Sequence, residues 1–372
     1  MTPIPPPPPP RRLSRRALLR AALLTAPLQA VAAATAAAGV RPRALVFPAD
    51  FGAHPDTRTE WWYATGWLKR QDGRPLGFQI TFFRVRTGIG ERNASRFAPR
   101  QLVLAHAAIA DPEFGRLRHS ERAARAGFGH AGYTIGRSEV WIGNWRFAQQ
   151  ENAQGQRYQA SVRGEDFAYD LALDATTPPL LNGQQGFSRK AAEPRHASFY
   201  YSRPQLAVSG SLSLNGRTEA VSGHAWLDHE WSSELLPDGA QGWDWVGINL
   251  ADGGGLMAFR LRDASGNTLW AAASWRAPGK VDRIFTPDVV HFLPLRHWRS
   301  PRTGIDYPVA WRLQVGEREF ELNPLLDDQE LDSSSSTGAI YWEGLSELRN
   351  GAGEAVGRGY LEMTGYAGRL ML

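Results

Sequence analysis

Short runs of large apolar residues, alternating with polar ones and broken by tight turns, fill the chain from Leu45 onward. Helical periodicity is scarce in this region. The clearest unit runs from 205 to 214, crosses Asn215-Gly216 and continues from 218 to 227, and an Asn-Gly pair between two such runs indicates a hairpin. A similar unit turns at Asp72-Gly73. The pattern predicts an all-β protein of antiparallel strands.

This strand pattern occurs twice along the chain. The segment 61–68 (WWYATGWL) resembles 243–250 (WDWVGINL), and each is followed by a glycine turn and a second apolar run. The repeat predicts two related β-domains, 39–235 and 236–372, with the break in the loop 232–242. Each is long enough to close into an antiparallel barrel of about eight to ten strands, and such a barrel can hold one small ligand inside.

The first 38 residues have the features of an export signal. Ser14-Arg15-Arg16 opens a twin-arginine pattern, and small residues within 30–36 offer cleavage sites. The apolar run from Ala17 to Ala34 is interrupted by Arg20 and Pro27. We therefore expect a signal peptide at 1–38 and no permanent membrane helix. The mature protein is therefore expected in the periplasm or outside the cell, and not as an integral membrane protein.

Composition excludes several classes of function. The chain has no cysteine, which rules out disulfides, a thiol nucleophile and a cysteine-ligated metal. Five of the 42 basic residues lie in the leader, which leaves 37 basic against 37 acidic residues in the rest of the chain. The near-neutral mature protein does not favour a nucleic-acid partner.

The densest group of ionisable residues lies in one predicted strand, 223–231 (GHAWLDHEW). Alternation along a strand puts His224, Trp226, Asp228 and Glu230 on one face, and His229 and Trp231 on the other. Acids and imidazoles beside indole rings are what a proton-transferring pocket for an apolar substrate needs. Charged residues at the rim of a sheet, without any chemistry, are the alternative interpretation.

Five motifs form a specific set that spans nearly the whole mature chain. They are FPADFGAHP at 47–55, TEWWY at 59–63, WLDHEW at 226–231, GWDW at 242–245 and YLEMTGY at 360–366. The set resembles the AttH/CrtC-like family, which includes carotenoid 1,2-hydratases. The resemblance implies two tandem lipocalin-like (calycin) antiparallel β-barrels. The activities it implies range from carotenoid hydration to related hydratases and pericyclases, and many bacterial members are exported proteins said to accompany an ABC transporter. The predicted leader favours this exported branch.

Hydration of a C=C bond, a carbon–oxygen lyase reaction, needs an acid, a base and a wall that stabilises a cation, and it needs no cofactor. We expect Asp244 to be the acid, because it shares a strand face with three apolar residues that would desolvate it and raise its pKa. Asp228 is the second candidate. His229 is the candidate base, with Glu230 and His224 close by in sequence.

The substrate-binding walls are expected to be mainly aromatic. The candidates are Trp226, Trp231, Trp243, Trp245, Trp61, Trp62, Tyr63 and Glu60. A ligand would lie in a barrel lumen lined by Trp61, Trp67, Phe78, Ile80, Phe82, Trp243 and Trp245. Two alternatives stay open at this point: the acids Asp244 and Glu60 could cap strand ends or pair with Arg84 or Arg86 inside the barrel, and the aromatic residues could simply fill the barrels.

We expect an apolar ligand of the isoprenoid or lipid-like class. Whether the protein is an enzyme also stays open, because an apolar lumen equally fits a carrier of such a ligand that serves an ABC-type envelope transport system. A metal site is not expected. The sequence lacks H-E-x-x-H, and His224 and Asp228 would lie about 13 Å apart on a strand. A serine hydrolase is not expected either, because the G-x-S-x-G turn is missing.

Overall fold

The computed structural model describes residues 39–152 and 155–370. The predicted signal peptide, 1–38, lies outside the described residues. In the described part the chain is almost entirely β-structure, which confirms the predicted fold class. The helical elements within residues 39–152 and 155–370 are single 3-10 turns, η1 (Ala49–Phe51) and η2 (Pro287–Val289). No helix in the described ranges is long and apolar enough to cross a membrane.

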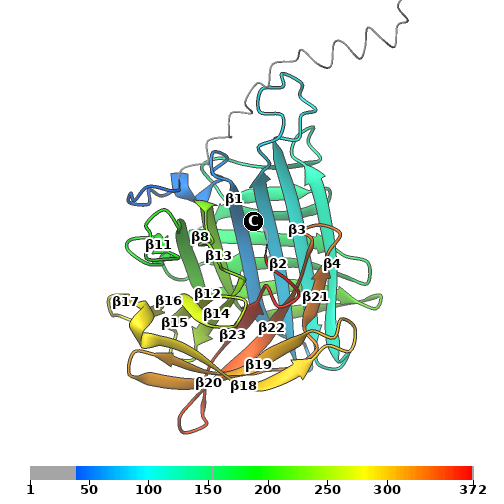
Figure 1. Cartoon of the computed structure of the whole chain (residues 1–372). Helices are drawn as coiled ribbons and strands as arrows, with labels where there is room; N and C mark the ends of the chain where they lie inside the picture. The colour runs from blue at the N-terminus through cyan, green and yellow to red at the C-terminus, as the bar shows by residue number, and fades with distance from the viewer. Residues whose placement is uncertain (1–38, 153–154, 371–372) are drawn as a thin grey trace, which may run out of the picture. The chain divides into compact units, whose positions relative to one another are not determined.

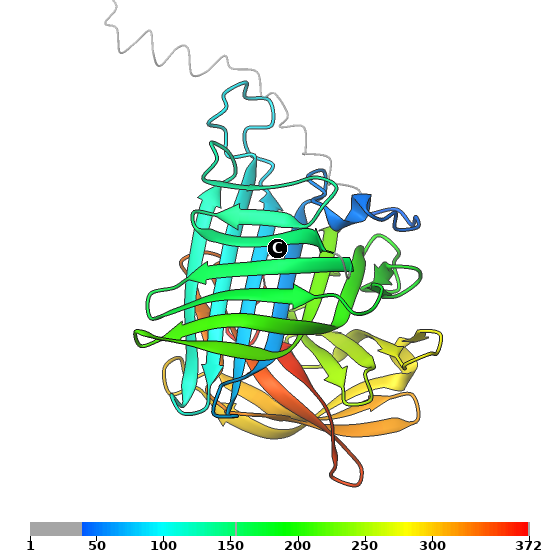
Figure 2. The same ribbon diagram turned by 180° about the vertical axis from the view of Figure 1, so that it is seen from behind.

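The first sheet has thirteen strands. They are β1 (Thr59–Lys69), β2 (Pro75–Arg86), β3 (Gln101–Asp111), β4 (Arg116–Arg125), β5 (Ala131–Tyr133), β6 (Glu139–Ile142), β7 (Trp145–Asn152), β8 (Gly155–Arg163), β9 (Phe167–Asp174), β10 (Leu180–Leu181), β11 (Phe187–Arg189), β12 (Ala197–Leu214) and β13 (Arg217–Glu234). Their order is β4-β3-β2-β1-β13-β12-β9-β8-β7-β6-β5, with β10 and β11 also paired to β12. The sheet curls into a barrel: β6 contacts β3 and β4, and the green strands lie across the blue and cyan ones (Figure 2).

The second sheet has ten strands. They are β14 (Gly242–Leu250), β15 (Gly255–Arg262), β16 (Thr268–Arg276), β17 (Arg283–Phe285), β18 (Val290–Arg299), β19 (Asp306–Val315), β20 (Arg318–Pro324), β21 (Glu330–Ser333), β22 (Ala339–Asn350) and β23 (Ala355–Met363). Their order is β17-β16-β15-β14-β23-β22-β20-β19-β18, with β21 paired to β22 (Figure 1). The two sheets together form the predicted tandem lipocalin-like architecture.

The predicted Asn-Gly hairpin joins β12 to β13. Leu214 pairs with Arg217, and the two residues between them have φ of 51° (Asn215) and 77° (Gly216). Positive φ at both central positions defines the turn type whose twist matches paired strands. This hairpin fixes the register of β13, the strand that carries the 223–231 motif.

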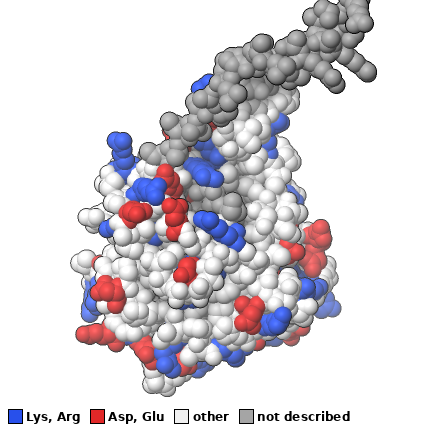
Figure 3. All heavy atoms as spheres, viewed as in Figure 1, with Lys and Arg blue, Asp and Glu red and all other residues white. Residues whose placement is uncertain are grey.

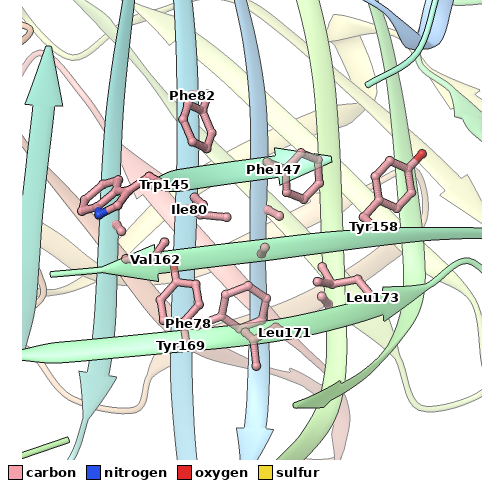
Figure 4. Packing of buried hydrophobic residues seen from close by; sticks show 14 of the residues in the cluster. Phe78, Ile80, Phe82, Trp145, Phe147, Tyr158, Val162, Tyr169, Leu171 and Leu173 are labelled. Carbon is pink, nitrogen blue, oxygen red and sulfur yellow. The ribbon is translucent and has the colours of Figure 1, made fainter. Parts of the chain in front are cut away.

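The interior of the first barrel is filled with side chains. Phe78, Ile80 and Phe82 are at most 1% exposed and contact residues from the opposite strands, including Trp145 and Phe147 (Figure 4). A second packed core fills the inner face of the other sheet. The prediction of a ligand-binding lumen inside a barrel is therefore wrong. Its residues divide between two faces, because Trp61, Trp67, Trp243 and Trp245 belong to a third cluster.

That third cluster lies where the two sheets meet. It contains apolar residues of β1 and β13 from the first sheet together with residues of β14, β15, β22 and β23 from the second. Hydrogen bonds also link the two sheets here. The Trp67 indole N–H donates to the Gly359 carbonyl (3.1 Å), and Asn249 Nδ2 donates to the Ala225 carbonyl (3.1 Å). The outer faces of the barrels therefore form a shared seam.

Candidate functional site

A cavity of about 550 Å³ opens within this seam. Its walls come from β1, β2, β3, β12 and β13 on one side and from β14, β15, β22 and β23 on the other, with residues 364–370 at its border. Most lining side chains are apolar or aromatic, among them Trp61, Tyr63, Phe83, Leu102, Leu104, Trp243, Trp245, Phe259, Leu261 and Tyr341. Charged side chains of both signs are scattered over the face seen in Figure 3 and form no field of one sign.

Asp228 borders the cavity from the middle of β13 and is 3% exposed. Its carboxyl accepts three hydrogen bonds, from the hydroxyls of Ser202 (2.6 Å) and Tyr200 (2.6 Å) and from the Trp226 indole N–H (2.7 Å). Burial raises the pKa of Asp228 to about 7, although the three donors act in the opposite direction. Near neutral pH this carboxyl can therefore both give and take a proton.

Tyr200 connects Asp228 to the second sheet. Its hydroxyl bonds to Asp228 Oδ2 and accepts the indole N–H of Trp245 on β14 (2.9 Å). When Asp228 carries the proton on Oδ2, Tyr200 accepts that hydrogen bond and its own hydrogen is free to point elsewhere. Asp228 and Tyr200 both line the cavity, so a proton can pass between the carboxyl and a bound molecule through the phenol.

Glu230 lies two residues beyond Asp228 on the same face and forms a buried ion pair with Lys190. Lys190 Nζ is 2.8 Å from Glu230 Oε1 and 3.1 Å from the Ser188 hydroxyl, and it lies 4.1 Å from the centre of the Phe259 ring. The Ser198 hydroxyl also donates to Glu230. This pair gives the apolar cavity one polar, charged corner.

Glu362, on β23, borders the cavity from the second sheet and was not among the predicted site residues. Its Oε1 accepts the indole N–H of Trp243 (2.7 Å). Burial raises the pKa of Glu362 against that hydrogen bond, and the charges of Asp228 and Glu230 raise it further. The spacing was visible in the sequence: Glu362 follows the aromatic Tyr360 by two residues, as Asp228 follows Trp226.

A fourth polar group lies on another wall of the cavity. His106, on β3, is fully buried, and its Nδ1 bonds to the Tyr341 hydroxyl (2.7 Å) and its Nε2 to the Ser336 hydroxyl (2.9 Å). Ser336 also donates to Glu121. Burial lowers the pKa of His106 to about 3, so the ring is neutral and serves as a hydrogen-bonding group. No motif or spacing in the sequence singles out His106.

His229 points to the opposite side of β13 from Asp228, as strand alternation predicts. Its Nε2 bonds to Glu60 Oε1 (2.9 Å) and its Nδ1 to the Tyr201 hydroxyl (3.1 Å). Burial lowers the pKa of His229 to about 4 despite the hydrogen bond to Glu60. Because the sheet separates its ring from Asp228, His229 cannot act as base on a molecule held beside that carboxyl.

Glu60 forms the centre of an ionic network on the side of the sheet that carries His229. Burial acts to raise the pKa of Glu60, but hydrogen bonds from His229 and His54 and the charge of Arg84 outweigh it and lower the pKa below its ordinary value. Arg84 Nε is 2.7 Å from Glu60 Oε2, and His54 Nδ1 is 2.8 Å from Oε1. The predicted alternative, pairing of Glu60 with Arg84, is what the structure contains.

The same network contains a set of atoms that could hold a metal ion. Ligand atoms of His54, Glu60 and His229 lie within 4.8 Å of one another. Each of them already has a hydrogen-bond partner in this set, and the Arg84 guanidinium is bound to the carboxylate. Two imidazoles and a carboxylate suit a transition metal, but the adjacent guanidinium opposes a cation. The residues fit an ion network better than a metal centre.

Asp244 is fully buried, yet it does not line the cavity. It lies on the face of β14 opposite to Trp243 and Trp245, where Arg260 Nε approaches Oδ2 (2.7 Å) and the Tyr366 hydroxyl donates to Oδ1 (2.9 Å). Arg262 Nε is 3.5 Å away. The first-choice acid is therefore buried, as predicted, but it is an ion-paired residue of the second barrel that does not line the cavity, which does not support its predicted role as the acid.

The other predicted residues lie in different places. Trp61, Tyr63, Trp243 and Trp245 border the cavity; so does Glu60, but its carboxylate is bound to His54, Arg84 and His229. Trp226 lies in the seam and holds Asp228. Trp62 is part of the first barrel's core, Trp231 stacks on His54 at 3.7 Å, and His224 is exposed and outside the cavity lining.

Comparisons with known proteins place this fold in a family. The AttH-like family matches residues 38–366. The crystal structure of a protein from Nitrosomonas europaea, described as an AttH, matches this fold with a TM-score of 0.81. The two sequences are 48% identical, and the match covers 88% of this chain and 98% of that one. Kievitone hydratase from Nectria haematococca shares the fold, with a TM-score of 0.66 at 16% identity over 88% of this chain and 94% of that one.

A curated relative is also similar over part of its length. The dehydratase asqC of Emericella nidulans is 23% identical over 159 residues, which are 40% of this chain and 42% of that protein. The match therefore spans less than half of the dehydratase. The family match covers nearly all the described residues, as the five motifs predict. The chain belongs to the AttH-like family.

Proposed function

We propose that the protein is a cofactor-independent hydratase or dehydratase that acts on a small, mostly apolar molecule in the cavity between the sheets. The observation that carries this proposal is Asp228, a buried carboxyl with a pKa of about 7 that faces an aromatic cavity. Proton transfer near neutral pH is most effective from groups with such a pKa. The hydratase and dehydratase among the similar proteins support the same reaction class.

In the hydration direction Asp228 gives its proton to one carbon of a C=C bond, through the Tyr200 hydroxyl. The resulting cation lies beside the indole faces of Trp243 and Trp245, which can stabilise it. A water molecule then adds its oxygen to the cation and passes one proton to Glu362. Return of that proton from Glu362 to Asp228 restores the starting state, so the net change is addition of one water. Dehydration is the reverse.

Two carboxyls of like charge suit these roles. Because the charge of Asp228 raises the pKa of Glu362, the pair favours a state in which one carries a proton and the other does not. One member can then act as the acid while the other acts as the base. Glu362 takes the place that the sequence assigned to His229.

The cavity also indicates the kind of substrate. Its volume of about 550 Å³ is in the range that holds a drug-sized molecule. The Lys190–Glu230 pair and the Tyr341 hydroxyl are among the polar groups that could bind oxygen substituents, while aromatic and aliphatic side chains contact the apolar part of the molecule. We propose a compact substrate with oxygen substituents and a C=C bond that conjugation makes easy to protonate.

The test is to identify the bound molecule and follow its conversion. The protein is purified from its native source, and its ligand is extracted and analysed by mass spectrometry before and after incubation with fresh protein in ¹⁸O-labelled water. We expect a gain or loss of water that Asp228→Asn abolishes and that Asp263→Asn, at an exposed site, leaves intact. A ligand that emerges unchanged from the wild type would overturn the hydratase proposal.

An unchanged ligand would favour the second candidate, a carrier of hydrophobic molecules. Its support is the apolar lining of the cavity, which can hold a ligand without any chemistry. If the predicted leader directs export, such a carrier would work in the periplasm and serve an ABC-type envelope transport system. Capture of the same ligand by wild type and Asp228→Asn, with no conversion by either, would support this function.

A further inference from the structure

The loop between β2 and β3 presents apolar side chains to solvent. Ile89 is 64% exposed and Phe97 66% exposed, and Phe128, on the neighbouring turn after β4, is 53% exposed. The rings of Phe97 and Phe128 stack with their centres 4.9 Å apart. Two stacked phenylalanines that remain this exposed lose much of the hydrophobic gain of burial. They therefore indicate a surface that is covered by something else.

This aromatic tip is surrounded by positive charge. The loop itself carries Arg92, Arg96 and Arg100, and the Arg125 guanidinium lies 5.3 Å from the centres of both rings. The one acid in the loop, Glu91, is paired with Arg86 at 2.9 Å. The tip therefore combines exposed apolar groups with unbalanced arginines.

The loop lies at the end of the strands that line the cavity. It joins Val85, near the end of β2, to Leu102, near the start of β3, and both residues border the cavity and are only half-buried. In Figures 1 and 2 the cyan loop extends beyond the ends of its own strands. A surface on which the tip rests would therefore be next to this end of the cavity.

We infer that the loop 87–100, together with Phe128, docks on the surface of an anionic lipid bilayer. Aromatic and aliphatic side chains insert at the boundary of headgroups and acyl chains, and arginines bind the anionic headgroups, each adding to the attraction at low salt. A protruding, positively charged tip fits a deformable charged surface, whereas a protein partner would need a groove or flat patch of matching shape.

This docking gives the cavity a source of ligand. Apolar small molecules concentrate in membranes, and the half-buried end of the cavity would lie beside the bilayer surface. That consequence rests on the proposed function, since it takes the ligand to be apolar. The docking itself rests on the loop alone.

The experiment measures binding of the full mature chain to large unilamellar vesicles by flotation. One set of vesicles contains phosphatidylcholine alone, and the other contains phosphatidylcholine with phosphatidylglycerol. We expect binding to the anionic vesicles that weakens with salt, and little binding to the neutral ones. Phe97→Ser with Phe128→Ser should weaken it by roughly tenfold or more, since two apolar anchors are lost. Arg92→Gln with Arg96→Gln should weaken it and reduce its dependence on salt.

The matched control is Leu293→Ser with Leu295→Ser on β18, which removes two other exposed apolar side chains, 51% and 44% exposed. This variant should bind vesicles as the wild type does, and all variants should unfold at the wild-type temperature. Wild-type protein that stays with neither set of vesicles would overturn the inference, as would equal losses in the loop variant and the control. A partner protein that binds the loop when vesicles do not would also overturn it. Asp228→Asn should bind normally, so failure of the proposed reaction leaves this result unchanged.

Discussion

Asp228 should make the folded protein less stable as the pH rises. The pKa of its buried carboxyl is about 7, so between about pH 4 and pH 7 the folded protein holds a proton that the unfolded chain has lost. The free energy of unfolding therefore falls through this window, by up to about 4 kcal/mol. We expect Asp228→Asn to be more stable than the wild type at about pH 8 and no more stable at about pH 4. Urea unfolding at both pH values measures this.

The control for Asp228 is an exposed carboxyl with the opposite shift. A hydrogen bond from Asn267 lowers the pKa of Asp263, so this group favours the folded state once it is ionised. Asp263→Asn should therefore gain no stability at the higher pH. A gain in Asp263→Asn, or none in Asp228→Asn, would contradict the raised pKa on which the acid role depends.

Arg84 should stabilise the protein by neutralising a buried charge. Glu60 and Arg84 are both fully buried and bind at 2.7 Å, so Arg84→Met leaves a carboxylate without its cation inside the first barrel. We expect a loss of about 3–5 kcal/mol in the free energy of unfolding. Arg163→Met breaks an exposed pair with Asp170 and should cost at most about 1 kcal/mol. Equal losses in urea unfolding would contradict the structural role of the Glu60 network.

The sequence could place single residues on strand faces, but it could not identify their partners. Alternation correctly separated Asp228 from His229, and it also placed Asp244 with apolar neighbours. What it lacked was the register of β14 against β15, which sets Asp244 directly opposite Arg260. An acid looks unpaired in sequence until the neighbouring strand is aligned with it, so the choice between the two aspartates required the structure.

At the scale of the element, β14 lines the cavity with Trp243 and Trp245, and Gly247 on the same strand leaves room for the Trp245 ring. A Cβ on Gly247 would lie 2.4 Å from the Trp245 ring and 3.1 Å from the Trp226 ring. Gly247→Ala should push Trp245 from Tyr200 and destabilise the protein by about 1–3 kcal/mol, with a changed near-ultraviolet circular dichroism spectrum. Gly351→Ala meets no atom within 4 Å and should change neither. A variant at Gly247 with wild-type stability and spectrum would show that the wall tolerates the added methyl group.

At the scale of the whole molecule, the sequence predicts both sheets and places the 223–231 segment near their junction, but it does not decide whether a cavity or a packed seam forms there. The repeat and the turn signals depend on neighbours along the chain and across one hairpin, and these contacts define each sheet. A cavity formed by the outer faces of two sheets depends on how those faces meet, which no local pattern records. The same limit explains why the sequence pattern predicts a lumen position for Trp61 and Trp245. Alternation shows that two residues share a face, but not whether that face is inside a barrel.

The seam that encloses the cavity should also make the two sheets unfold together. Trp226 and Trp245 are buried in it from opposite sheets, so opening either sheet exposes apolar surface of the other. We expect hydrogen exchange in increasing urea to show one common midpoint for peptides of β1 and β22. Trp226→Ala should weaken the seam and separate the midpoints, whereas Trp145→Ala, inside the first barrel, should lower the stability of that barrel's strands first. Two distinct midpoints in the wild type would mean that the barrels are energetically independent, and the cavity would then open whenever the less stable one does.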